Sequence, residues 1–193
     1  MNTRKAGSNN QIVAGSLGAV ARKNNTSIAM GFMGVKAFVM VDVSSSMDTP
    51  DAGENKSRYK AACEQLERLQ NEMPGEIAVG AFSNNAQFSP SGVPLHMGGM
   101  TDMVAALQMM LMADNTDIRL VLISDGEPDN ESKTLSVASK FKSKIDTIFV
   151  GDETGPGRNF LRKLAAATGG IAVVNKTQDL GLLSENLTKL IAA

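Results

Sequence analysis

Short apolar runs that alternate with amphipathic stretches dominate the sequence after residue 34. Runs of this kind are typical of parallel strands that are covered on both faces. They occupy residues 35–41, 77–82, 118–123, 146–150 and 171–174. The stretches between them repeat apolar residues at spacings of three and four, which indicates helices. The alternation predicts an α/β fold, with an open, mostly parallel sheet and helices on both faces. Gln87 and Phe88, just after a Ser-Asn-Asn turn, are expected to begin a short antiparallel edge strand.

The first 34 residues have a different character. They are rich in Gly, Ser, Asn and Ala and show no period of 2 or 3.6, although a short helix fits near Ile12 to Ala21. We therefore predict an N-terminal extension (1–34) and a folded domain (35–193). The first 41 residues carry five basic and no acidic side chains, and the rest carry fourteen basic and twenty acidic. Because the basic residues are scattered without aromatic neighbours, they favour a docking or solubilising arm over a nucleic-acid partner.

The composition narrows the possible sites. Cys63 and His96 are the single residues of their types, so a metal site built on cysteines or histidines is excluded and any metal must be held by oxygen. A lone cysteine also fits a reducing compartment. No run approaches the ~20 apolar residues of a transmembrane helix, and no apolar segment follows Arg4 and Lys5 as in a secretory signal. These features predict a cytoplasmic protein without a membrane partner.

Polar side chains gather where the predicted strands end. Asp42, Ser44 and Ser46 alternate after the first strand, so in an extended turn they point the same way. Asp125 ends the 118–123 strand, and Thr101 precedes the helix that starts near residue 103. Hydroxyl and carboxylate oxygens suit a hard divalent cation. If the hydroxyls bind directly and the carboxylates through water, the cation keeps most of its charge, and an open position favours an anionic oxygen from another protein.

These residues resemble a known site. Asp42-Val43-Ser44-Ser45-Ser46, Thr101-Asp102 and Asp125-Gly126 are similar, in this order, to the three elements of the metal-ion-dependent adhesion site of von Willebrand factor A (VWA) domains. The likeness covers about residues 35–193. Two details depart from the family pattern: Ser45 stands where glycine is usual, and Met100 separates a glycine pair from the threonine.

The resemblance implies a Rossmann-like sheet of six strands with one antiparallel edge strand. It also implies Mg²⁺ or Mn²⁺ held directly by Ser44, Ser46 and Thr101, and through water by Asp42 and Asp125. Family members bind protein partners, often through an Asp or Glu carboxylate that completes the metal's coordination shell. Intracellular bacterial members tend to act as adaptors, some with AAA+ ATPases or in metal-stress systems.

The predicted function is thus a metal-dependent protein-binding adaptor. Met97, Met100 and Glu127, close to the predicted metal in sequence, are candidate partner contacts, since methionine suits adaptable surfaces. The alternative is a structural or assembly subunit whose metal site only stabilises loops and whose partner contacts lie in the N-terminal extension. An enzyme is disfavoured, because the chain lacks a phosphate-binding loop and a nucleophile elbow, and Ser44 stands where a dehalogenase-type phosphatase needs a second aspartate.

Overall fold

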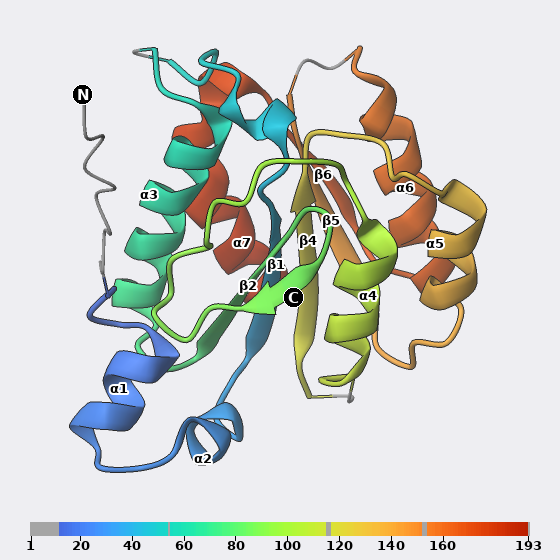
Figure 1. The fold of residues 1–193 in the computed structure, drawn as a ribbon. Coiled ribbons are helices and arrows are strands. Elements are labelled where there is room, and N and C mark those ends of the chain that lie inside the picture. The colour runs from blue at the N-terminus through green and yellow to red at the C-terminus, as the bar shows by residue number, and fades with distance from the viewer. Residues whose placement is uncertain (1–11, 54, 115–116, 152–153, 193) are drawn as a thin grey trace, which may run out of the picture.

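A six-stranded sheet forms the centre of the molecule (Figure 1). The computed structural model describes residues 12–53, 55–114, 117–151 and 154–192. The strand order is β3-β2-β1-β4-β5-β6; β3 runs antiparallel to β2, and the other neighbouring pairs are parallel. The strands are β1 (Ala37–Asp42), β2 (Ile77–Phe82), β3 (Ala86–Phe88), β4 (Arg119–Ser124), β5 (Ile145–Val150) and β6 (Ala172–Asn175). The predicted fold class, including the antiparallel edge strand, is confirmed.

Helices cover both faces of the sheet. In Figure 1, α3 and α7 lie on one side, and α4, α5 and α6 lie on the other. The helices are α1 (Leu17–Lys23), α2 (Ile28–Phe32), α3 (Arg58–Glu72), α4 (Met103–Leu111), α5 (Glu131–Ala138), α6 (Pro156–Thr168) and α7 (Leu183–Ala192). Two 3-10 turns, η1 (Ser45–Asp48) and η2 (Thr177–Leu182), follow β1 and β6.

Alternation along β1 divides the core into two halves. All six residues of β1 are buried, because helices shield both faces of this central strand. Phe38 and Met40 pack with the residues of α4 and α6, whereas Val39 and Val41 pack with those of α3 and α7. Successive side chains of a strand point to opposite faces, so a continuous apolar run fills two cores at once. This arrangement places the carboxyl ends of the two central strands, β1 and β4, side by side.

The described part of the predicted extension, residues 12–34, packs against this body. Leu17 is 2% exposed and belongs to the core. The Gly18 N–H donates to the Pro90 carbonyl at 2.9 Å, and a methyl group on Gly18 would come within 2.5 Å of that oxygen. The expected short helix forms as α1, capped by the Ser16 hydroxyl, which accepts a hydrogen bond from the Ala19 N–H. Residues 1–11 lie outside the described residues, and the division of the chain at residue 34 stays a prediction.

A second short helix, α2, was not predicted. It has five residues and no apolar period, and Ser27 caps its start by accepting a hydrogen bond from the Met30 N–H. Its last residue, Phe32, meets Phe38 of β1 and Phe88 of β3 edge to face, with ring centroids about 6 Å apart. Aromatic packing at its end therefore holds this helix against the sheet.

Candidate functional site

The loops after β1 and β4 meet because these strands are parallel neighbours in the sheet. Their register pairs Val41 with Ile123, which brings Asp42, the last residue of β1, next to Ser124, the last residue of β4. Crevices at the carboxyl ends of strands are the usual ligand sites of open α/β sheets. The structure brings the five predicted metal ligands to this edge; we call Asp42, Ser44, Ser46, Thr101 and Asp125 the strand-end cluster.

Asp42 forms the buried floor of the strand-end cluster. Its residue is fully buried, and both carboxylate oxygens are hydrogen-bonded. Oδ1 accepts from the Ser44 N–H at 2.8 Å, and Oδ2 accepts from the Ser124 hydroxyl at 2.6 Å. Burial raises the pKa of Asp42 to about 6, and the hydrogen bonds from Ser124 and Ser44 oppose that rise by stabilising the charged form. The carboxylate thus fixes both strand ends.

Ser44, Ser46 and Asp125 form a continuous row of oxygens above this floor. The Ser44 and Ser46 hydroxyl oxygens are 3.1 Å apart. The Ser46 hydroxyl donates to Asp125 Oδ1 at 2.7 Å. Ser46 lies in η1, which turns the chain directly after β1 so that both hydroxyls face the end of β4. The two hydroxyls lie together as expected, but Ser46 reaches this position through a 3-10 turn and not through the extended turn that the alternation predicted.

Thr101 lies beside the loop after β4 and comes from a third loop. Its N–H donates to Asp129 Oδ1 and its carbonyl accepts from the Asp129 N–H, each at 3.2 Å. A methyl group on Gly126 would lie 3.5 Å from the Thr101 hydroxyl oxygen, so this hydroxyl borders the loop after β4. Within the described residues, no hydrogen bond involves the Thr101 hydroxyl. Asp102 caps α4 by accepting a hydrogen bond from the Ala105 N–H at 3.0 Å, which positions the threonine.

Ser45 links the first and third loops. Its hydroxyl accepts a hydrogen bond from the Gly99 N–H at 2.9 Å, and its own N–H donates to the Gly99 carbonyl at 3.1 Å. Among the described residues, the non-glycine residues with positive φ are Asn25 and Asn55, so Ser45 has an ordinary backbone conformation. Serine in the usual glycine position therefore imposes no left-handed strain. It contacts the neighbouring loop rather than the oxygens of the strand-end cluster.

The donor set of the strand-end cluster fits a small divalent cation. Mg²⁺ binds oxygens at about 2.0–2.1 Å in octahedral geometry, which places adjacent ligand oxygens about 3 Å apart. The separation of the Ser44 and Ser46 hydroxyl oxygens, 3.1 Å, matches such an edge. In the part of the chain that the structure describes, no group of three or more His, Cys, Asp or Glu side chains could hold a metal. A cation at the strand-end cluster would therefore rely on hydroxyl oxygens.

Arg58, the first residue of α3, is a neighbour of the strand-end cluster that sequence reasoning missed. Its Nη1 donates to Asp125 Oδ2 at 2.7 Å. Its Nε and Nη2 donate to the two carboxylate oxygens of Asp51 at 2.9 and 2.6 Å. The paired carboxylates, that of Asp51 first, raise the pKa of Arg58 above its ordinary value. The sequence held one weak signal: a positive side chain in the first turn of a helix opposes the helix dipole, and an acidic partner offsets this effect.

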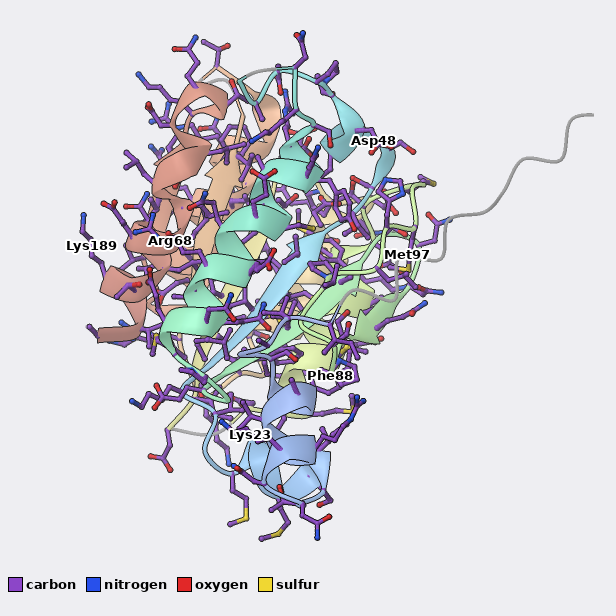
Figure 2. The ribbon with its side chains drawn as sticks, turned by 90° about the vertical axis from the view of Figure 1, so that its left-hand side faces the viewer. Lys23, Asp48, Arg68, Phe88, Met97 and Lys189 are labelled. Atoms are coloured by element: carbon purple, nitrogen blue, oxygen red, sulfur yellow. The ribbon has the colours of Figure 1, made fainter. Side chains whose placement is uncertain are left out.

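The three predicted partner contacts lie on loops around this edge of the sheet. Met100 is 64% exposed, and Glu127 is exposed in the loop after β4. Met97 is half-buried; its sulfur accepts a hydrogen bond from Gln87 Nε2 at 3.4 Å, and Figure 2 shows it on the same side as Asp48. Nearby, His96 Nε2 lies 2.9 Å from Asp48 Oδ1. Their role in binding stays a prediction.

Comparison with known proteins identifies the fold. No protein-family model matches the sequence, and no curated protein matches it. Solved structures with the same fold include a von Willebrand factor type A protein from Catenulispora acidiphila, with TM-score 0.63, 20% identity, and 81% of this chain and 41% of that chain covered. The ArnB paralog VWA2 from Sulfolobus acidocaldarius matches with a TM-score of 0.57 and 23% identity, over 82% of this chain and 44% of that chain. An aerotolerance-related membrane protein from Bacteroides fragilis NCTC 9343, with multiple mutations to serines, gives TM-score 0.61, 17% identity, and coverage of 82% and 99%.

These likenesses show a VWA fold. The chain spans less than half of the length of two of the three structures. No helix among the described residues is long and apolar enough to cross a membrane.

Proposed function

We propose that this chain is a protein-binding module that holds Mg²⁺ or Mn²⁺ at the strand-end cluster and binds a partner's Asp or Glu carboxylate there. The main support is the geometry of Ser44, Ser46 and Asp125, whose oxygens form a row at the carboxyl ends of β1 and β4 with an octahedral edge between the two hydroxyls. The VWA fold agrees with this proposal, because domains of the family that the sequence resembles bind protein partners.

The residues present explain why a carboxylate is the expected ligand. A bound cation supplies a positive charge and an open coordination position. Ser44, Ser46 and Thr101 offer neutral hydroxyls, which do not reduce that charge. Asp42 engages both of its oxygens in hydrogen bonds and acts by orienting the Ser44 backbone. An anionic oxygen from another protein would then be the strongest additional ligand. We propose further that the module is cytoplasmic, has no enzymatic activity, and serves a larger complex such as an AAA+ ATPase or stress-response assembly.

Ser44→Ala is the sharpest test of the metal site, because it removes one proposed ligand oxygen, 3.1 Å from the hydroxyl oxygen of Ser46, and changes no charge. Calorimetric titration of Mg²⁺ into metal-stripped protein should give one site in the native chain. The variant should bind at least about tenfold more weakly, as is common when groups at a metal site are removed. Ser139→Ala, an exposed serine at the end of α5, is the matched control and should leave binding unchanged. Equal affinity in native and Ser44→Ala protein would refute the site.

The alternative, an assembly subunit with partner contacts through its N-terminal extension, has two observations in its favour. Met30 and Met33 in and after α2 are 62% and 81% exposed, and a groove of about 470 Å³ adjoins α1 and α2. If partner binding persisted in EDTA but were lost on changing Met30 and Met33 to serine, the alternative would replace the metal-dependent proposal.

A further inference from the structure

Arg58 is the cation that the structure places on the strand-end cluster. Its side chain is 16% exposed, and the Asp125 carboxylate that it contacts is fully buried. All three guanidinium nitrogens are engaged, one with Asp125 and two with Asp51. Such a fork of charge-assisted hydrogen bonds is a strong and directional interaction. The contacts of Arg58 therefore join the start of α3 to the loop after β1, through Asp51, and to the loop after β4, through Asp125.

The two oxygens of the Asp125 carboxylate accept hydrogen bonds from different side chains. Its Oδ1 accepts from the Ser46 hydroxyl, and its Oδ2 accepts from Arg58. A divalent cation bound beside Ser46 would draw on the negative charge of the same carboxylate. With Arg58 in contact, that charge is already balanced by a cation of the chain itself, and two cations close together repel each other.

The position of Arg58 in its helix also indicates that the two carboxylates, and not the helix, hold its side chain. It is the first residue of α3, where the helix dipole disfavours positive charge. The helix gains its N-terminal cap from Ser57, whose hydroxyl accepts a hydrogen bond from the Lys60 N–H, so Arg58 is not needed for capping. What holds the guanidinium in place is the pair of carboxylates, Asp51 and Asp125.

We infer that Arg58 is an internal cation that competes with the divalent metal for the carboxylate of Asp125, so that it lowers the metal affinity of the strand-end cluster. The inference rests on the proposed metal site. In the metal-free protein Arg58 neutralises the buried carboxylate and stabilises the fold. In the metal-bound protein it opposes the bound charge, so metal binding must weaken or displace the Arg58–Asp125 pair.

Arg58→Gln tests this inference, because it should raise the affinity for Mg²⁺ if Arg58 competes with the metal and lower it if Arg58 only orients Asp125. Under competition, the variant should bind Mg²⁺ about tenfold or more tightly than the native chain, the scale on which one adjacent charge shifts the affinity of a carboxylate for a cation. Its metal-free melting temperature should fall, and saturating Mg²⁺ should recover most of that loss. If Arg58 only orients Asp125, the variant should instead bind Mg²⁺ more weakly. The measurements are calorimetric titration of Mg²⁺ and thermal unfolding with and without Mg²⁺.

Arg68→Gln is the matched control. Arg68 lies on the same helix, three turns further along, and pairs with Glu72 at 2.9 Å on the exposed surface. Figure 2 shows Arg68 well away from Asp48, which follows Ser46 at the end of the sheet that carries the strand-end cluster. This control should leave Mg²⁺ affinity unchanged. Arg58→Lys keeps the positive charge, so its Mg²⁺ affinity should stay closer to that of the native chain than that of Arg58→Gln.

The outcomes separate the inference from the proposed function. Mg²⁺ binding by the native chain with equal or weaker binding by Arg58→Gln would overturn the inference and leave the metal site in place. Binding by Arg58→Gln alone would support the inference strongly. Failure of both proteins to bind Mg²⁺ would overturn both. If Arg58→Gln is unfolded without metal, Arg58→Lys, whose ammonium group cannot form the three-nitrogen contact, is titrated instead. Tighter Mg²⁺ binding than in the native chain then supports the competition, and equal or weaker binding contradicts it.

Discussion

Ser124 makes the buried contact on which the strand-end cluster depends, so its removal gives a quantitative test of the site. Its residue is fully buried, and its hydroxyl donates to Asp42 Oδ2 at 2.6 Å and accepts from the Gly126 N–H at 3.1 Å. Ser124→Ala deletes one oxygen with little change of shape. The variant leaves a buried carboxylate oxygen without its donor, which is the costly way to lose a hydrogen bond.

The expected loss can be estimated from the charge of the acceptor. A hydrogen bond to a charged group contributes about 1.5–3 kcal/mol, against about 1 kcal/mol for a neutral pair. We expect Ser124→Ala to lower the free energy of unfolding by about 2–3 kcal/mol. In a chain of this size that corresponds to a fall of about 5–10 °C in melting temperature.

Ser184→Ala is the matched control, because Ser184 is similarly buried and its hydroxyl donates to a neutral acceptor, Gln65 Oε1, at 3.0 Å. This variant should lose about 1 kcal/mol. Urea unfolding of metal-free protein at pH 8, where Asp42 with its pKa of about 6 is ionised, measures both values. Equal losses in Ser124→Ala and Ser184→Ala would refute the claim that Ser124 stabilises a buried negative charge.

Two further predictions concern packing and reactivity. A methyl group on Gly157 would come within 2.5 Å of the Gly126 backbone. Gly157→Ala should therefore lower the free energy of unfolding in urea by about 1–3 kcal/mol and weaken Mg²⁺ binding. Gly181 has open space around it, so Gly181→Ala should change neither quantity. Burial raises the pKa of the Cys63 thiol to about 11, so at pH 8 it should react with iodoacetamide about a hundredfold more slowly than an exposed cysteine and gain reactivity as the pH rises. Fast alkylation of the folded protein at pH 8 would contradict the burial of Cys63.

The fold could be predicted because its strands are nearly continuous apolar runs. The 77–82 strand has the predicted ends, and the other four parallel strands differ from prediction by one or two residues. Helix α2 could not be predicted in this way. It has five residues, and aromatic contacts with β1 and β3 hold it in place rather than an apolar stripe of its own.

The residues of the strand-end cluster could be predicted from the sequence, but Ser124 and Arg58, which contact them, could not. Asp42, Ser44 and Ser46 are local in sequence, and parallel strands bring their carboxyl ends together. Ser124 lies 82 residues from Asp42, and Arg58 lies 67 residues from Asp125. Which strand is the neighbour of β1, and in which register, depends on tertiary packing. Sequence patterns therefore indicated the oxygens of the cluster but not the donor and the cation that hold them.

The paired hydrogen bonds between Ser45 and Gly99 bear on the entropy of binding. They join two loops that are 54 residues apart in the chain, and the Asn84 side chain accepts a further hydrogen bond from the Met100 N–H in the second loop. Fixing a residue's backbone costs about 1–2 kcal/mol of conformational entropy. In this protein the two loops are ordered when the chain folds, by hydrogen bonds that do not involve the oxygens of the strand-end cluster. A ligand arriving at these loops has few backbone torsions left to order, so local charge, more than loop flexibility, governs its affinity.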